Sequence, residues 1–330
     1  YALLYMDGDQ MGRWLSGTHE GLATFGDILH PEVREALQND PNWQSLLKMK
    51  RLITPAVHAA ISQALGWFAL RLVPHIVEER HAGRLIYAGG DDVLALVPMD
   101  EVLAVARELR AAFSGHIRFE SGSLQVVLAA EAKQDDGDPP CMPEGSVSGY
   151  VEWEDEVFLT MGPRATASMG VVLAHHLQPL DLVLDAVREA ERLAKHRYGR
   201  NALVLNLLKR SGERLTVGTK WSYKEVPDVV CLLTMIIQHF ERKTLSGKWP
   251  YATKAEASIL EGLPVAAQEA ELRRLLKRHT ESDLSPAEAK EVEQLPRPLI
   301  KWAESLGSSG LTEMARWLLV CNFIAKGGDV

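Results

Sequence analysis

Cysteine and long hydrophobic runs are scarce in this sequence. Three of its 330 residues are cysteines, Cys141, Cys231 and Cys321, and no two of them form a CxxC pair. This excludes a disulfide framework and a self-contained zinc site, and it predicts a reducing, cytoplasmic environment. The longest uncharged apolar stretch in the second half of the chain, 229–240, is shorter than the roughly 18 to 20 residues that cross a bilayer. We therefore expect no membrane helix.

An excess of positive charge is missing as well. The 44 acidic residues outnumber the 36 basic ones, and the formal net charge is −8. Such a surface does not bind nucleic acid as a whole, so contact with RNA or DNA must be local or made through partner proteins. The chain begins at Tyr1 within an apolar run, without an initiator methionine or a signal peptide. We expect it to be cut from a longer protein.

Strand and helix patterns alternate over the first 212 residues. Apolar runs predict strands at 1–6, 84–88, 93–97, 124–130, 165–175 and 201–208. Helical spacing predicts one long helix or two over 46–79, with a kink near Pro74, and further helices at 102–113 and 179–198. This order predicts an α+β domain of the ferredoxin-like βαββαβ type, with an antiparallel sheet, helices on one face and one extra αβ unit. The stretch 115–164, which contains a loop-like segment at 135–149, interrupts the pattern as an irregular insertion.

After Gly212 the strand signal fades. Helical patterns recur at 226–241, 255–260, 266–279, 286–294 and 311–325, and turn signals rich in Gly, Ser and Pro, such as Pro296–Pro298, separate them. We therefore expect two domains, an α+β domain over 1–212 and a small all-helical domain over 213–330.

Two acidic clusters lie at the ends of apolar strands. Asp7 and Asp9 follow the first strand, and Asp91 and Asp92 follow Gly89–Gly90 at the tip of a predicted hairpin. Either cluster alone is typical of a turn. In a split βαβ sheet the two clusters can meet, and four carboxylates would then repel one another without a cation. The pattern therefore predicts a site for Mg²⁺ or Mn²⁺, which prefer oxygen ligands.

Five segments together resemble a known family. They are Asp7–Gly12, Ile61–Leu65, Leu85–Ala95, Ala194–Lys195 and Arg200–Ala202. Over 1–212 the chain resembles the catalytic palm, a nucleotide-cyclase-like domain, of the large subunit of type III CRISPR effector complexes, closest to the Cmr (type III-B) branch. The helical end of the chain, up to Cys321–Ala325, resembles the same family.

The resemblance implies an activity. The family's palm makes cyclic oligoadenylates from ATP when its complex holds a target RNA, so the implied partners are other subunits of the complex and, through them, crRNA and target RNA. Asp7, Asp91 and Asp92 would be catalytic, with Asp9 close by as a fourth metal ligand. Which of Asp91 and Asp92 faces the ion stays open, because successive strand residues point to opposite faces.

The resemblance also suggests residues that bind the nucleotide. Room for the nucleotide beside the sheet would come from small residues, Gly8, Ala88, Gly89 and Gly90. The other two residues suggested to bind the nucleotide are Ser62 and Lys195. Lys195 is either a cation that neutralises the triphosphate or a solvated lysine on a helix. Ser62 is either a hydrogen-bond donor to the base or ribose, or a packed helix residue.

Some family features are missing from this chain. Neither a His-Asp nuclease module nor a first palm is visible, and the family's zinc-binding cysteines are absent. We therefore expect the chain alone to bind ATP and metal but to turn over poorly. An architectural subunit without turnover is the alternative. A diguanylate cyclase is disfavoured, although such enzymes carry a related Gly-Gly turn, because they are usually followed by nothing like this helical segment.

Overall fold

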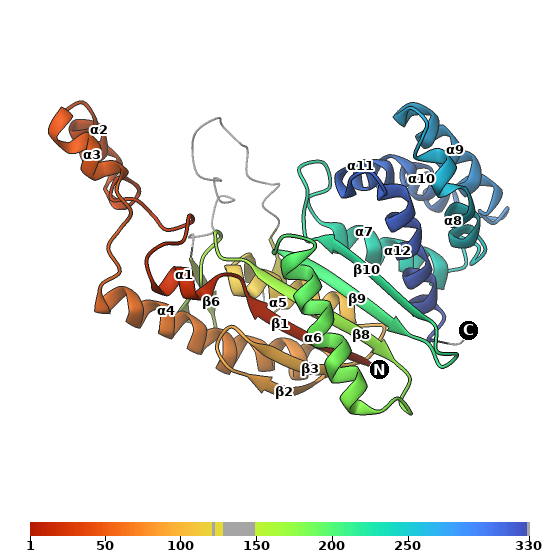
Figure 1. Cartoon of the computed structure of the whole chain (residues 1–330), viewed down its shortest axis with the longest axis horizontal. Helices are drawn as coiled ribbons and strands as arrows, with labels where there is room; N and C mark the ends of the chain where they lie inside the picture. The colour runs from red at the N-terminus through yellow and green to blue at the C-terminus, as the bar shows by residue number, and fades with distance from the viewer. Residues whose placement is uncertain (121–122, 128–148, 329–330) are drawn as a thin grey trace.

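A six-stranded sheet forms the centre of the computed structural model, which describes residues 1–120, 123–127 and 149–328 (Figure 1). Its strands are β1 (Ala2–Gly8), β2 (Arg84–Ala88), β3 (Val93–Val97), β8 (Ala167–Ala174), β9 (Ala202–Leu208) and β10 (Arg214–Lys220), in the spatial order β10-β9-β8-β1-β3-β2. Only β8 and β9 pair in parallel, and the other neighbours are antiparallel. The sheet is therefore mostly antiparallel, as expected.

Helices cover both faces of this sheet. On one face, α5 (Val102–Ser114) and α7 (Val229–Glu241) pack over the larger core, and on the other face α6 (Leu180–His196) covers a smaller core around Leu3 and Val172. The prediction of helices on one face only is wrong. Strand β8 is buried along its whole length, so its second face also needs a cover, and the parallel step from β8 to β9 requires a crossover such as α6.

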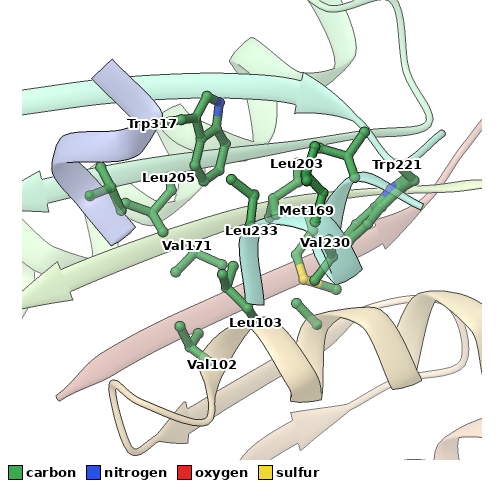
Figure 2. Packing of buried hydrophobic residues seen from close by; sticks show 14 of the residues in the cluster. Val102, Leu103, Met169, Val171, Leu203, Leu205, Trp221, Val230, Leu233 and Trp317 are labelled. Carbon is green, nitrogen blue, oxygen red and sulfur yellow. The ribbon is translucent and has the colours of Figure 1, made fainter. Parts of the chain in front are cut away.

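The larger core joins the sheet to the helices at the end of the chain. Figure 2 shows α5, α7 and α12 (Gly310–Ala325) packed over sheet residues through Val102, Leu103, Val230, Leu233 and Trp317. Indole nitrogens add polar links, since Nε1 of Trp317 donates to the carbonyl of Gly218 at 3.2 Å and Nε1 of Trp302 donates to Oγ1 of Thr219 at 3.0 Å. The helices after the sheet are thus attached to it by buried side chains.

The predicted helix over 46–79 is interrupted. Helix α3 (Pro41–Lys48) ends inside this range, and α4 (Pro55–Trp67) begins only after a break. The N-cap of α4 is Thr54, whose hydroxyl accepts a hydrogen bond from the amide of Val57. Two π-helical segments, η2 (Phe68–Leu72) and η3 (His75–Arg80), continue α4 on either side of Pro74. By length and composition, Pro55–Arg80 is the one helix of the described residues that could cross a membrane. This is weak evidence, because buried core helices pass the same test and Leu72 and Ile76 lie in the core.

The segment before α4 extends away from the sheet. It contains α1 (Met11–Leu15), η1 (Gly26–Ile28), α2 (Pro31–Gln38) and α3. Helices α2 and α3 have no buried residue and stand apart from the rest of the chain (Figure 1).

The predicted insertion contributes two small hairpins. They are β4 (Ile117–Glu120) with β5 (Ser123–Val126), and β6 (Tyr150–Trp153) with β7 (Glu156–Leu159). The strand predicted over 124–130 corresponds to β5 up to residue 126, and residues 128–130 lie outside the described residues. The predicted loop over 135–148 also lies outside them.

Two elements of the second half were not expected. Strand β10 lies beyond residue 212 and pairs with β9, so the sheet extends past the predicted boundary. Helix α11 (Pro296–Leu306) begins where prolines suggested a turn, because proline is tolerated in the first turn of a helix. The remaining helices, α8 (Trp249–Leu260), α9 (Val265–Arg278) and α10 (Pro286–Gln294), correspond to the segments predicted over 255–260, 266–279 and 286–294, although α9 ends one residue earlier than predicted.

Candidate metal centre

Three carboxylates meet at one end of the sheet. Asp7 lies near the end of β1, and Asp91 and Asp92 lie in the turn between β2 and β3. Because β1 and β3 are neighbours, with Met6 opposite Val93, the two acidic clusters come together. One oxygen from each of the three side chains lies within 4.8 Å of the other two. The predicted meeting of the two clusters therefore occurs, with three carboxylates rather than four.

Glycines permit this close approach. A Cβ atom at Gly8 would lie 2.8 Å from Cβ of Asp91, so a side chain at position 8 would push Asp91 away. Gly90 has a φ of +95°, a conformation that glycine adopts without strain. The amide of Gly89 donates to the carbonyl of Asp92 at 2.9 Å and closes the turn. The half-buried Ala88 pairs with Val93 in the hairpin.

The electrostatics of the turn favour a cation. Burial raises the pKa of Asp91, and the neighbouring Asp92 raises it further. Burial also raises the pKa of Asp92, against the effect of a hydrogen bond from Tyr5. Oδ1 of Asp92 is buried and has no hydrogen-bond partner within the described part of the chain. A divalent ion would satisfy this oxygen and offset the desolvation of the carboxylates, so the residues present fit Mg²⁺ or Mn²⁺.

Lys195 reaches the same site from α6. Its ammonium forms an ion pair with Asp7 and lies 2.7 Å from Oε1 of Glu191, one turn earlier on the helix. Burial, together with the positive charge of Arg200, lowers the pKa of Lys195 to about 8. Burial and the charges of Asp9 and Asp92 raise the pKa of Glu191 to about 7. Lys195 is therefore not a solvated helix lysine, and its contact with a triphosphate stays a prediction.

Asp9 has a different environment from Asp7. It is 2% exposed, and its carboxylate accepts hydrogen bonds from the hydroxyls of Thr166 and Ser168, both at 2.7 Å, and from the amide of Asn201 at 2.9 Å. These bonds occupy both of its oxygens, and Asp9 is absent from the group of three carboxylates. We therefore leave Asp9 out of the proposed ligand set.

Ser62 lies on the helix that approaches the Gly90 turn. It is exposed on α4, and that helix approaches the turn through Leu65, whose Cβ would lie 3.7 Å from a Cβ atom at Gly90. Within the described residues, Ser62 makes no side-chain hydrogen bond. Its predicted contact with a base or ribose remains untested.

Three residues near the centre were not singled out as site residues from the sequence. Tyr5 precedes Asp7 by two residues on β1, and Glu191 precedes Lys195 by four on α6, so strand and helix periodicity could have indicated both. Arg200 could not have been found by periodicity, because it lies in the turn between α6 and β9.

Comparisons with known proteins show which proteins this chain is similar to. Residues 1–128 match the family described as Cas10/Cmr2, second palm domain. The chain is 34% identical over 213 residues to the CRISPR system Cmr subunit Cmr2 of Pyrococcus furiosus, covering 64% of this chain and 19% of that protein. It is 31% identical over 156 residues to the Cmr2 subunit of Saccharolobus solfataricus, covering 47% of this chain and 13% of that protein. The chain thus spans about a fifth of the length of the first relative.

Solved structures share the fold. A chain of a type III-B Cmr-beta complex in the apo state superposes with a TM-score of 0.60 at 17% identity, covering 86% of this chain and 34% of that one. A chain of the same kind of complex bound to cognate target RNA gives a TM-score of 0.59 at 17% identity, covering 87% of this chain and 36% of that one. At this identity the likeness concerns the fold.

Residues 1–128 thus match a second palm domain of the Cas10/Cmr2 type. This match and the similarity to two Cmr2 proteins confirm the resemblance to the large subunit of type III-B CRISPR complexes.

Proposed function

We propose that this chain is part of the large subunit of a cytoplasmic type III-B CRISPR complex, and that its carboxylate centre is a nucleotidyltransferase site. The substrate is ATP, and the product is a cyclic oligoadenylate made when the complex binds a target RNA. The observation that carries the proposal is the group of Asp7, Asp91 and Asp92, whose oxygens lie within 4.8 Å of one another in a domain of this family.

The side chains can be given separate tasks. Asp7, Asp91 and Asp92 would hold Mg²⁺ or Mn²⁺. Such ions activate an attacking hydroxyl and stabilise a leaving pyrophosphate. Tyr5 would support the charged form of Asp92, since its hydroxyl lowers the pKa of that carboxylate. Lys195 supplies a positive charge beside Asp7 that would attract phosphate oxygens.

Glycines and α4 would shape the nucleotide pocket. The absence of a side chain at Gly8 keeps the turn close to β1, and its absence at Gly89 leaves room for the side chain of Tyr87. Together with Gly90, these glycines would leave space for a nucleotide. Carboxylates and lysine recognise features that every nucleoside triphosphate shares. Selection of adenine would therefore depend on the surface of α4 and β2 that includes Ser62 and Ala88.

A second candidate is an architectural role without turnover. The helices after β10 expose apolar side chains, among them Ile259 and Tyr251 of α8, which are 72% and 50% exposed. Such residues suit contact with other subunits of a complex. If the wild-type complex makes cyclic oligoadenylate, the chain is catalytic. If it makes none, the role is architectural.

The first prediction tests the carboxylates. In a complex that carries this chain, Asp91→Ala/Asp92→Ala should reduce oligoadenylate synthesis from ATP by more than about 100-fold, because the metal ligands are lost. Synthesis is followed with radiolabelled ATP and, in parallel, GTP. The fold should persist, since removing two buried like charges relieves repulsion. Circular dichroism checks this.

The control variant removes two carboxylates at a distance from the proposed metal ligands. Asp185→Ala/Glu189→Ala removes two exposed carboxylates from α6, and it should leave synthesis unchanged. Full activity of the Asp91/Asp92 variant would refute the metal centre. If the wild-type complex binds target RNA but makes no product from ATP, only the architectural role remains. If it makes product from GTP alone, ATP is not the substrate.

A further inference from the structure

Residues 26–52 form an arm that is not packed into the core of the chain. The arm contains η1, α2 and α3, and its two α-helices stand apart from the sheet (Figure 1). Neither α-helix has a buried residue, and α2 packs mainly against α3. Each is eight residues long, and helices shorter than about 12 to 15 residues are marginal in water without packing. The described part of this chain supplies no such packing, so we expect another molecule to cover the arm.

The surface of the arm is largely apolar. Six of its large apolar side chains are exposed, and none of them belongs to a hydrophobic core of the described residues: Ile28, Val33, Trp43, Leu46, Met49 and Leu52. Tryptophan and methionine are enriched at the centres of protein interfaces, and tryptophan often contributes most of the binding energy. The arm therefore has the composition of a contact surface.

The α3 end of the arm carries unbalanced positive charge. The chain has 44 acidic residues, yet none lies between positions 41 and 77. Lys48, Lys50 and Arg51 are exposed and form no ion pair with any residue that the structure describes. Nζ of Lys50 donates instead to the carbonyl of His19 at 2.8 Å. A surface that complements this end of the arm must therefore supply carboxylates or other anions.

The apolar side chains favour a protein over RNA as the source of these anions. Proteins bind single-stranded RNA by stacking its bases on aromatic side chains. Trp43 is the only Phe, Trp or Tyr residue among positions 26–52, and the other exposed apolar side chains are aliphatic and offer no ring for stacking. A protein surface with an apolar pocket and an acidic rim complements both the aliphatic side chains and the cations.

We propose that the arm docks on a separate, acidic protein subunit of the complex. Trp43 and Leu46, three residues apart on α3, enter an apolar pocket of that subunit. Lys48, Lys50 and Arg51 lie opposite carboxylates at the rim of the pocket. The arm projects away from the sheet, so it reaches a neighbour without covering the carboxylate centre (Figure 1). This rests on the proposed function only in that the chain is part of a complex of several subunits.

Zero-length cross-linking tests the chemistry of the partner. A carbodiimide joins an amine directly to a carboxylate, and it is added to the assembled wild-type complex before mass spectrometry. Lys48 or Lys50 should be linked to an Asp or Glu residue of another subunit. Links that stay within the large subunit would overturn the inference. Ultraviolet cross-links from the arm to RNA, without a link to a subunit, would also overturn it and would make RNA the partner.

Hydrogen exchange tests the contact itself. Peptides of α2 and α3 should exchange at least about 100-fold more slowly in the complex than in the isolated 330-residue chain, because docking suppresses local opening. Trp43→Ala and Lys48→Glu/Arg51→Glu should each reduce this protection by about tenfold or more. Equal exchange of these peptides in the chain and in the complex would refute the docking surface.

Matched controls remove the same kinds of side chain elsewhere. Leu177→Ala truncates an apolar residue that is 68% exposed, and Lys254→Glu/Lys290→Glu reverses two exposed charges on α8 and α10. Neither should change the protection of α2 and α3. Circular dichroism of the isolated variants should match wild type, because every substituted side chain is exposed. A loss of protection in the controls as large as in the arm variants would show that the effect does not depend on the arm.

Failure of this inference differs from failure of the proposed function. If the complex makes cyclic oligoadenylate but α2 and α3 are neither cross-linked nor protected, the inference is wrong and the function stands. If they are cross-linked to a subunit and protected but no product is made from ATP, the inference stands and the catalytic proposal is wrong. If the chain joins no complex, both are wrong.

Discussion

Asp7 and Asp9 are the same residue type, two positions apart, yet they have different roles. Asp7 is half-buried and joins Asp91, Asp92 and Lys195, whereas Asp9 is buried and accepts three hydrogen bonds from the protein. A carboxylate whose oxygens are already satisfied has little to offer a metal ion. The environment, and not the residue type, separates the proposed metal ligand Asp7 from Asp9, which is satisfied by hydrogen bonds within the protein.

This difference predicts opposite effects on stability. Asp9→Asn should lower the free energy of unfolding by about 2 to 4 kcal/mol, because it weakens three buried hydrogen bonds and removes the charge near Arg110. Asp91→Asn should change it by less than about 1 kcal/mol, since the native carboxylate is itself desolvated. Urea denaturation measures both. Equal losses for the two variants would contradict these assignments.

The sequence was sufficient to find the strand-end carboxylates, but not their final grouping. Asp91 and Asp92 stand out because a turn needs only one of them. The role of Asp9 depends on Thr166 and Ser168, which are separated from it by 157 and 159 residues along the chain. No local pattern carries that information. The same holds for the left-handed conformation of Arg200, which is held by Asp9 just after β1, by Arg110 of α5 through Asn201, and by Lys220 of β10.

At the scale of elements, a cluster of charged side chains joins η3 to α5. His81 lies 3.1 Å from Oε2 of Glu101 and 3.3 Å from Oε2 of Glu108, and Arg80 makes two hydrogen bonds of 3.0 Å to Glu108. The hydrogen bond to Glu108 raises the pKa of His81, against the effect of burial. The cluster therefore stabilises the contact most when His81 is protonated.

The pH dependence follows from the direction of this shift. Because the folded pKa of His81 exceeds the unfolded one, its contribution is complete below the unfolded pKa and is lost as the pH rises through the folded pKa. Wild type should therefore exceed His81→Gln in stability by more at about pH 6 than at about pH 9. Urea denaturation at the two pH values measures this, and a constant difference would contradict it.

Elements were predictable where local signals agree with packing. The strands of β1, β3 and β8 are apolar, buried and bounded by turn residues, so their patterns were clear. Helix α11 was missed because Pro296 and Pro298 suggested a turn, although both lie in the first turn of the helix. The break before α4 was missed because the apolar spacing in the sequence continues across it. The apolar residues of α2 and α3 are not buried, so their spacing did not indicate packing.

For the whole molecule, the sheet and the helices after it share one buried core. Trp317 and Trp302 are completely buried and donate to Gly218 and Thr219 of β10. The predicted boundary at 212 lies before this strand, which completes the sheet. The strand signal of β10 is weak because the strand lies at the edge of the sheet and contains Gly218 together with four charged or hydroxyl-bearing residues, Arg214, Thr216, Thr219 and Lys220.

The shared core predicts cooperative unfolding. Hydrogen exchange followed by mass spectrometry should give β9 and α12 the same opening free energy. Trp317→Ala should lower both by about 3 to 5 kcal/mol through loss of a large buried side chain. Trp43→Ala, at a residue 42% exposed on α3, should change neither by more than about 0.5 kcal/mol. Earlier exchange of α12 than of β9 would show two independent units.

The hydrogen bond between Tyr198 and Glu313 has a consequence for how the molecule is made. Ribosomes release a chain from its N-terminus, so β1 and the β2–β3 turn emerge long before α12. Glu313 accepts from both the hydroxyl of Tyr198 and the amide of Gly218. Residues 198–201 therefore receive their last support only after translation has passed residue 313. Asp7, Asp91 and Asp92 can therefore come together early, but Arg200, in the turn between α6 and β9, reaches its final position late in synthesis.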